Sequence, residues 1–270
     1  MTQAHATARP TPDETMAAPG GRPQVLLFQH IPKTAGTSLR HALEVLYPAP
    51  ERMYLYDRHD LDRAVDPHRF AELPLEERAA LRLVMGHFAF GIHDVVPGSS
   101  RYVTMLRHPV DRVASLYFHF KLLAEPRPGS RGAQERETIE RENLSLEDWV
   151  FGGKQLQADN GMVRMIAGRR GIGFGACPDD LLAEALDHIE THYAAVLIRG
   201  SMAQSVEILG ALTGRALPIV GRRNVNAGRV QLQDIDPSVR QRIRQLNDLD
   251  ARLFESMAGR FATTYERLVR

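Results

Sequence analysis

The stretch from residue 24 to residue 43 constrains the fold more than any other, because three patterns of different character follow one another in it. The apolar run 25–28 is closed off by Pro32 and predicts a short buried strand. Leucines at helical spacing then predict a helix over 37–46. The sequence therefore predicts a strand, a tight loop and a helix, which is the repeating unit of a parallel α/β sheet.

The loop between this strand and this helix carries a lysine, a glycine and three hydroxyl side chains. Backbone N–H groups at a helix N-terminus are unpaired and partly positive, so a phosphate or sulfate group fits there. Gly36 allows the backbone to close on the anion, and Lys33 supplies a full positive charge. We expect hydroxyl hydrogen bonds from Thr34, Thr37 and Ser38. The candidate anion-binding residues are Lys33, Thr34, Ala35, Gly36, Thr37 and Ser38.

The order Pro-Lys-Thr-x-Gly-Thr-Ser at 32–38 is not that of the Walker P-loop, in which the lysine follows the last glycine. It resembles the 5′-phosphosulfate loop of sulfotransferases that use 3′-phosphoadenosine 5′-phosphosulfate (PAPS). The longer run 30–39 is most similar to the carbohydrate branch related to heparan sulfate 2-O-sulfotransferase. This resemblance implies a P-loop-like α/β fold, PAPS as co-substrate and PAP as product. An ordinary capped strand–turn–helix is the alternative reading.

Length and composition are those of an ordinary α/β domain. The 270 residues can bury one core, so we expect a single domain over 23–270 after a disordered tail, 1–22, that lacks the apolar segment of a signal peptide. A net charge of +1 argues against a broadly cationic nucleic-acid binder, and no apolar run reaches membrane-spanning length. The single cysteine, Cys177, fits a reducing compartment, so we predict a cytoplasmic location.

Strand and helix patterns alternate along the rest of the chain and predict a central parallel sheet between two helical layers. Strands are predicted at 53–56, 83–88, 101–106 and 195–198. Helices are predicted at 75–83, 109–120, from 146 onward, 160–167, 180–192, 202–212 and 237–268. The segment 124–144 is rich in charge, proline and glycine and predicts a mobile loop.

PAPS carries a second phosphate on its ribose, so an enzyme that uses it needs a second anion site. Arg107 ends a predicted strand, and Ser115 lies about two turns into the helix that follows. An arginine can hold phosphate through two hydrogen bonds, and a serine hydroxyl can add another. The run 106–115 resembles the 3′-phosphate motif of the same enzymes, Arg-x-Pro-x-x-Arg-x-x-Ser. A structural arginine followed by a surface serine is the alternative.

Sulfuryl transfer also needs a base for the acceptor hydroxyl and a cation at the leaving phosphate. Lys33 matches the family lysine that serves the leaving group. Gly-His-Phe at 86–88 is similar to the segment that carries the proposed base of the 2-O-sulfotransferases, which makes His87 the candidate base. A histidine at a strand end is otherwise often structural. The competing candidates are His30, His59, His93 and Asp94.

Three further features lie in the second half of the chain. Arg222 and Arg223 stand where the resemblance places a basic loop over the nucleotide, so both are candidate donor-binding residues. His188 and His192 are one helical turn apart, but without the glutamate of a zinc motif they indicate a solvated helix face more than a metal site. Cys177 has no partner cysteine and is expected to be a packed thiol.

The leading hypothesis is therefore transfer of a sulfuryl group from PAPS to a hydroxyl without a metal, and the resemblance implies a carbohydrate acceptor. A P-loop kinase would need an acidic residue at a strand end to hold Mg²⁺, and this chain has Arg107 there. A nucleotide-binding protein that has lost turnover is the third possibility. The acceptor itself and the oligomeric state cannot be read from the sequence.

Overall fold

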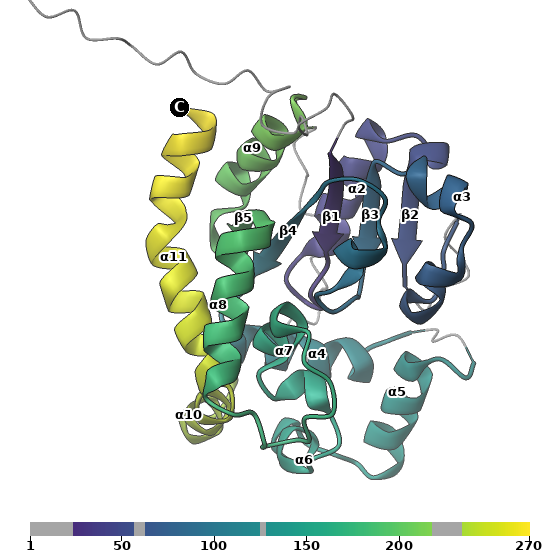
Figure 1. The fold of residues 1–270 in the computed structure, drawn as a ribbon. Coiled ribbons are helices and arrows are strands. Elements are labelled where there is room, and N and C mark those ends of the chain that lie inside the picture. Colours follow the sequence, from purple (N-terminus) through teal and green to yellow (C-terminus); the bar gives the residue numbers. More distant parts are fainter. Residues whose placement is uncertain (1–23, 57–62, 125–127, 218–233) are drawn as a thin grey trace, which may run out of the picture.

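A parallel five-stranded sheet forms the centre of the protein. The computed structural model describes residues 24–56, 63–124, 128–217 and 234–270 (Figure 1). Every neighbouring pair in the sheet is parallel, and the strand order is β2-β3-β1-β4-β5. The strands are β1 (Val25–Gln29), β2 (Arg52–Leu55), β3 (Leu83–Gly86), β4 (Ser100–Leu106) and β5 (Tyr193–Ile198). The predicted α/β class with a central parallel sheet is therefore confirmed.

Helices alternate with these strands and continue past the last one. The α-helices are α2 (Gly36–Leu46), α3 (Leu75–Ala79), α4 (Pro109–Lys121), α5 (Arg131–Arg141), α6 (Leu146–Phe151), α7 (Gly161–Ala167), α8 (Asp180–His192), α9 (Met202–Thr213), α10 (Pro237–Leu246) and α11 (Asp248–Val269). Short 3₁₀ turns lie at Ala49–Glu51, Pro67–Glu72, Ile92–Val95, Leu156–Ala158 and Arg199–Ser201. No helix in the described ranges is long and apolar enough to cross a membrane.

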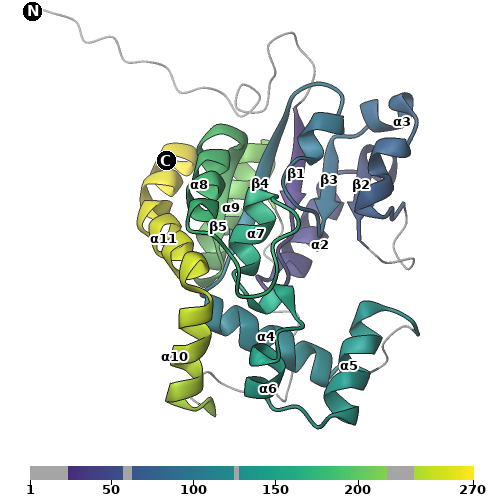
Figure 2. The same ribbon diagram turned by 60° about the horizontal axis from the view of Figure 1, so that its bottom comes forward.

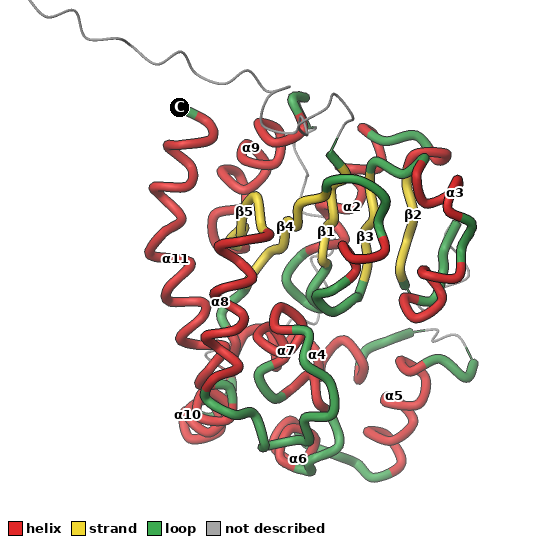
Figure 3. The backbone as a smooth tube through the Cα atoms, in the orientation of Figure 1, coloured by secondary structure: helices red, strands yellow, loops and turns green. Residues whose placement is uncertain are grey.

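The helices form two layers around the sheet and a third group beyond its carboxyl edge. Helices α2 and α9 lie behind the sheet in Figure 1, whereas α8 lies in front of it and α7 lies beside α8, near the lower ends of the strands. Helix α11 runs along the β5 edge, and the tube view shows how its length covers that edge (Figure 3). Helices α4, α5, α6 and α10 lie below the strands in both ribbon views, on the side where the strands end (Figures 1 and 2). Any ligand bound at the strand ends therefore lies between the sheet and this lower helical group.

Burial on both faces explains the apolar composition of the central strands. All five residues of β1 are buried, and the main core runs from β1 through β3 and β4 to α8 and α11. A second, smaller core lies in the lower helical group around Trp149, Tyr117 and Ile243. Both cores contain residues from distant parts of the chain. The lower helical group is therefore packed against the sheet layer and is not joined to it by a linker alone.

A buried ion pair ties the lower helices to the sheet layer. The guanidinium of Arg112 on α4 lies 3.5 Å from the carboxylate of Asp250 on α11, and both side chains are fully buried. The same carboxylate accepts hydrogen bonds from the backbone N–H groups of Met162 and Val163 at the start of α7, at 3.1 and 2.8 Å. Asp250 therefore holds a cation from one helix and the N-terminus of another.

The segment 124–144 is not the loop that its composition predicts, since Arg131–Arg141 forms α5. Ser130 caps the helix by accepting a hydrogen bond from the N–H of Ala133. Only Ile139 of this helix is buried, and Glu135 accepts a hydrogen bond from the indole of Trp149. One buried residue in eleven is too weak an apolar pattern to reveal a helix, and tertiary contacts supply the stabilisation.

The predicted helix over 237–268 is two helices, which meet at Asn247. The fully buried amide of Asn247 donates to the carbonyls of Ala158 and Ile243. Its oxygen accepts from the N–H of Asn160. These contacts reach a distant segment, so the break follows from tertiary packing and not from a helix-breaking residue. The other predicted helices and strands are present, with ends that shift by a few residues.

Candidate active site

Four residues that each follow directly on the end of a strand make up the centre of the candidate site. Tyr56 follows β2, His87 follows β3, His30 follows β1 and Arg107 follows β4. These four strands are neighbours in the sheet, so their ends lie side by side. The chain leaves β1 toward β2 and leaves β4 toward β5, so the connections diverge between β1 and β4. Such a divergence at the carboxyl edge is where open α/β sheets bind ligands.

The loop after β1 has an unusual backbone. Lys33 and Ala35 both adopt left-handed conformations, with φ of 71° and 80°, although neither is glycine. Left-handed residues that alternate with residues of negative φ turn successive backbone N–H groups toward one side and form an anion-binding concavity, and helix α2 begins directly afterwards at Gly36. Strained conformations of this kind cost free energy and are concentrated at ligand sites. The backbone of this loop is compatible with the predicted anion cradle, which stays a prediction.

Two residues of the loop make contacts that the sequence did not predict. The hydroxyl of Thr34 is buried and donates to the carbonyl of Ile31 at 2.8 Å, so it stabilises the loop and can offer an anion only its backbone N–H. A Cβ on Gly36 would lie 2.0 Å from Cδ2 of His30, so Gly36 makes room for that imidazole. Thr37 is exposed and Ser38 is half-buried, and both hydroxyl groups remain candidates for the anion.

The two cations predicted for the two phosphate sites meet across the divergence between β1 and β4. The guanidinium of Arg107 donates to the carbonyl of Lys33 at 3.1 Å. Burial, and then the charge of Arg107, lower the pKa of Lys33 to about 8. The two positive groups repel each other. A bound anion relieves this repulsion and is stabilised by both charges. Ser115 lies on α4, half-buried, and the structure gives it no hydrogen bond to Arg107.

His87 is exposed and is held by its backbone and by one ring nitrogen. Its N–H donates to the carbonyl of Leu55 at 2.9 Å. Its Nδ1 lies 2.6 Å from the carbonyl oxygen of His30. A carbonyl can only accept, so Nδ1 carries the proton and Nε2 of the neutral ring carries the lone pair. The imidazole therefore has the tautomer of a general base.

His30 and Tyr56 are buried behind His87, with 8 % and 5 % of their surface exposed. A hydrogen bond of 2.7 Å joins Nδ1 of His30 to the hydroxyl of Tyr56. Burial and then the charge of His87 hold the pKa of His30 well below its usual range, which makes His30 a poor candidate for the base. The sequence did not single out Tyr56. Its position as the last residue of the predicted strand 53–56 was the available signal.

The other predicted competitors for the base lie elsewhere. His93 and Asp94 lie in the 3₁₀ turn before β4, where the ring of His93 contacts the hydroxyl of Tyr102 near the start of that strand. His59 lies outside the described residues. His119 was not predicted, but burial and then the charges of Lys33 and His87 lower its pKa to about 4. A neutral imidazole on α4 is thus part of the same electrostatic environment.

Predictions for the second half of the chain have mixed outcomes. Arg222 and Arg223 lie outside the described residues. His188 and His192 do not lie on a solvated face. The ring of Phe90 stacks on that of His188 with 3.7 Å between the ring centroids, and the ring centroids of His192 and His93 are 4.5 Å apart. Burial raises the pKa of the Cys177 thiol to about 11, as expected for a packed thiol.

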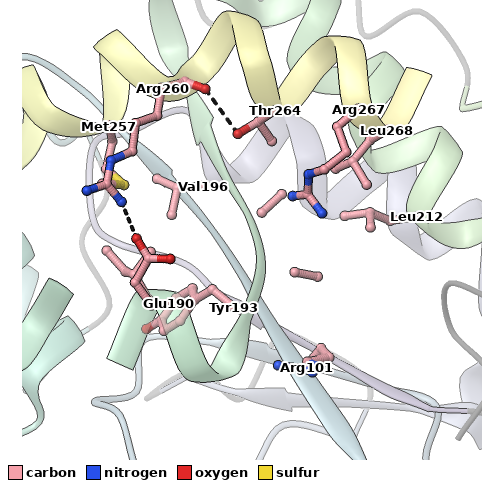
Figure 4. Close-up of a pocket in the computed structure, with 13 residues that line it drawn as sticks. Arg101, Glu190, Tyr193, Val196, Leu212, Met257, Arg260, Thr264, Arg267 and Leu268 are labelled. Carbon is pink, nitrogen blue, oxygen red and sulfur yellow. Dashed lines mark hydrogen bonds and ion pairs between the residues drawn. The ribbon is translucent and has the colours of Figure 1, made fainter. Parts of the chain in front are cut away.

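A separate cleft of about 540 Å³ lies between α11 and the first residues of β5 (Figure 4). Arg101, Arg260 and Arg267 line it, and Arg260 forms an ion pair with Glu190. The cleft lies near the starts of β4 and β5, whereas the candidate site lies at the ends of strands. It is therefore not the place where the predicted site residues meet.

Comparisons with known proteins agree with the predicted resemblance. A model described as the sulfotransferase family matches residues 22–152, which include the loop after β1, His87, Arg107 and Ser115. Among solved structures, a sulfotransferase from Alicyclobacillus acidocaldarius matches at 16 % identity and a TM-score of 0.45, over 91 % of this chain and 99 % of that one. No curated protein matches the chain. The similarity to sulfotransferases is thus confirmed for the first half of the chain, and the relation to the heparan sulfate branch stays a prediction.

Proposed function

We propose that the protein transfers a sulfuryl group from PAPS to a hydroxyl group, with a carbohydrate as the expected acceptor, and releases PAP and a sulfate ester. The observation that carries the proposal is the hydrogen bond between Arg107 and the Lys33 carbonyl, because it joins the two candidate phosphate sites at the sheet's ligand-binding edge. The match to the sulfotransferase family supports sulfuryl transfer as the general chemistry.

The residues divide the reaction between them. The acceptor oxygen attacks sulfur, the bond from sulfur to the 5′-phosphate oxygen breaks, and the electron pair stays on that oxygen. Lys33 and the backbone N–H groups at the start of α2 stabilise this developing charge. His87 takes the acceptor's proton at Nε2, the nitrogen with the lone pair. Arg107, with Ser115, holds the 3′-phosphate, and the predicted Arg222 and Arg223 bind the nucleotide.

Arg107 gives a test of the donor that needs no acceptor. In EDTA, wild-type protein is expected to bind PAP tightly and AMP much more weakly, because AMP lacks the 3′-phosphate. Arg107→Ala should weaken PAP binding by about 1.5–3 kcal/mol, the usual contribution of a charge-assisted hydrogen bond, and weaken AMP binding much less. Isothermal calorimetry measures all four affinities.

Arg101 supplies the matched control, since it lies on the same strand but at its other end. Arg101→Ala should bind PAP like the wild type. Equal affinity of the wild type for PAP and AMP would refute the assigned 3′-phosphate site. Affinity that requires Mg²⁺ and favours ATP would support the kinase alternative.

The pKa of Lys33 predicts how donor binding depends on pH. Below about pH 8 the ammonium is charged, and a bound anion stabilises that form. PAP affinity should therefore be highest below about pH 8 and fall as the pH rises above it, by at most about tenfold per pH unit for one proton. Calorimetry across this range tests the effect. Lys33→Met should bind PAP more weakly and show no such fall, and a fall that persists in this variant would assign it to another group.

The acceptor class rests on the resemblance and not on the described side chains. Glycans, lipid-linked sugars and small hydroxyl compounds are all chemically possible, and a panel of such acceptors is the direct way to choose among them. If the protein binds PAP but transfers sulfate to none of these acceptors, it is a nucleotide-binding protein that has lost turnover. The cytoplasmic location also stays a prediction.

A further inference from the structure

We propose that Tyr56 and His30 form a positioning pair that holds the His87 imidazole in the tautomer and orientation of a general base. The inference deepens the proposed function and rests on it for the role of His87. Tyr56 acts through His30 and is not itself a catalytic residue.

The backbone brings the three residues together at the ends of three adjacent strands. The N–H of His30 donates to the carbonyl of Gly86 at 2.8 Å, and the N–H of His87 donates to the carbonyl of Leu55 at 2.9 Å. Gly86 is itself closely packed, since a Cβ there would lie 2.0 Å from the Leu55 oxygen. The three Cα positions are therefore fixed by the sheet, and only the side-chain torsions remain to be set.

His87 is exposed, so its ring needs contacts on the protein side to keep one orientation. The ring of His30 lies 4.5 Å away and tilted by 42°, and the ring of Tyr56 lies 4.7 Å away and nearly perpendicular, at 89°. The His30 carbonyl then fixes the remaining rotation by accepting from Nδ1 at 2.6 Å. His30 thus contributes both a wall and the acceptor that selects the tautomer.

The Tyr56 hydroxyl in turn fixes His30. The hydrogen bond of 2.7 Å joins it to Nδ1 of His30, whose opposite side is packed against Gly36. The His30 ring is neutral and buried, so its Nδ1 cannot bond to water. The Tyr56 hydroxyl supplies the hydrogen bond that this buried polar atom needs. Removal of this hydroxyl leaves the His30 ring without that bond and loosens the ring that packs on His87. The His87 ring can then turn away from the His30 carbonyl that selects its tautomer.

Histidine ring nitrogen NMR reads the tautomer directly and needs no substrate. With ¹⁵N-labelled histidine, the His87 signals, assigned by their loss in His87→Ala, are expected to show a protonated Nδ1 and an unprotonated Nε2 when the ring is neutral. Tyr56→Phe should move both signals toward a mixture of tautomers. Tyr54→Phe is the matched control, because it also removes one tyrosine hydroxyl, which donates to the Glu44 carboxylate at 2.6 Å. This variant should leave the His87 signals unchanged.

Kinetics supplies the second readout. Tyr56→Phe should lower kcat about tenfold, the scale of one lost hydrogen bond, with PAP affinity unchanged. In a His87→Ala background the same change should cause no further loss, whereas a purely structural role would lower kcat equally in both backgrounds. His30→Gln, which keeps a side chain able to bond Tyr56, should lose less activity than His30→Ala.

Three results would overturn the inference: a wild-type His87 with its proton on Nε2, His87 signals that do not respond to Tyr56→Phe, or equal kcat losses in the two backgrounds. Failure of the proposed function is separate from these. If His87→Ala keeps near wild-type turnover, His87 is not the base, and the NMR spectra alone then decide whether Tyr56 positions its ring.

Discussion

Replacing His87 with alanine is expected to lower kcat by about 10²–10⁴, the usual contribution of a positioned acid–base group. PAP binding should stay nearly unchanged, because the His87 ring is held by the ends of β1 and β2 and not by the anion loop. The kcat profile of the wild type should rise with pH as a histidine loses its proton, and this rise should be absent from the variant. Steady-state kinetics with the true acceptor, together with PAP calorimetry, measures both effects.

Lys33→Ala is the comparison that separates the two catalytic roles. It should weaken donor binding and turnover together, since Lys33 contacts the group that develops charge. Near wild-type turnover of His87→Ala would place the base elsewhere. His119 would then be the next residue to replace, because burial and then the charges of Lys33 and His87 lower its pKa to about 4, so its ring lies within the electrostatic reach of both groups.

Asp250→Ala is expected to lower the free energy of unfolding by about 3–5 kcal/mol, because it leaves the buried guanidinium of Arg112 without its counter-charge. It also removes the acceptor for two N–H groups at the start of α7. Urea denaturation measures the change.

The position of Arg112 in the motif that supplies Arg107 suggests ligand binding, but its burial against Asp250 makes it a structural residue.

Asp248→Ala is the control on the same helix, since that carboxylate is exposed and its ion pair with Arg252 is worth no more than about 1 kcal/mol. The pair Arg112→Met with Asp250→Leu should recover much of the loss, because two apolar side chains leave no buried charge. An Asp250→Ala protein as stable as the wild type would show that the pair does not stabilise the fold.

The candidate site residues whose place in the fold the sequence predicted lie within contiguous patterns. The loop from Lys33 to Ser38 follows an apolar run and precedes a helical one, so its place at a strand end needs no knowledge of distant contacts. Arg107 is predictable for the same reason, since a parallel strand delivers its next residue to the ligand-binding edge. That Arg107 contacts Lys33 depends on β1 and β4 being neighbours, which the sequence does not reveal.

The contacts that the sequence did not predict depend on strand order and on torsion angles. Tyr56 reaches His30 and His87 only because β3 lies between β2 and β1. The hydroxyl of Thr34 turns away from the anion site because the loop adopts left-handed conformations on either side of it. Asp250 is far from Arg112 in the sequence, so nothing local shows that the two charges are buried together.

A dual-label transfer assay tests the central claim most directly. The protein is incubated with a panel of sugars and other hydroxyl acceptors, once with PAPS labelled in its sulfur and once with ATP labelled in its terminal phosphate. We predict that sulfur label appears in an acceptor with one PAP released per ester, in EDTA, and that Lys33→Ala abolishes most of this transfer. Transfer of the phosphate label to an acceptor without any transfer of the sulfur label would contradict the account.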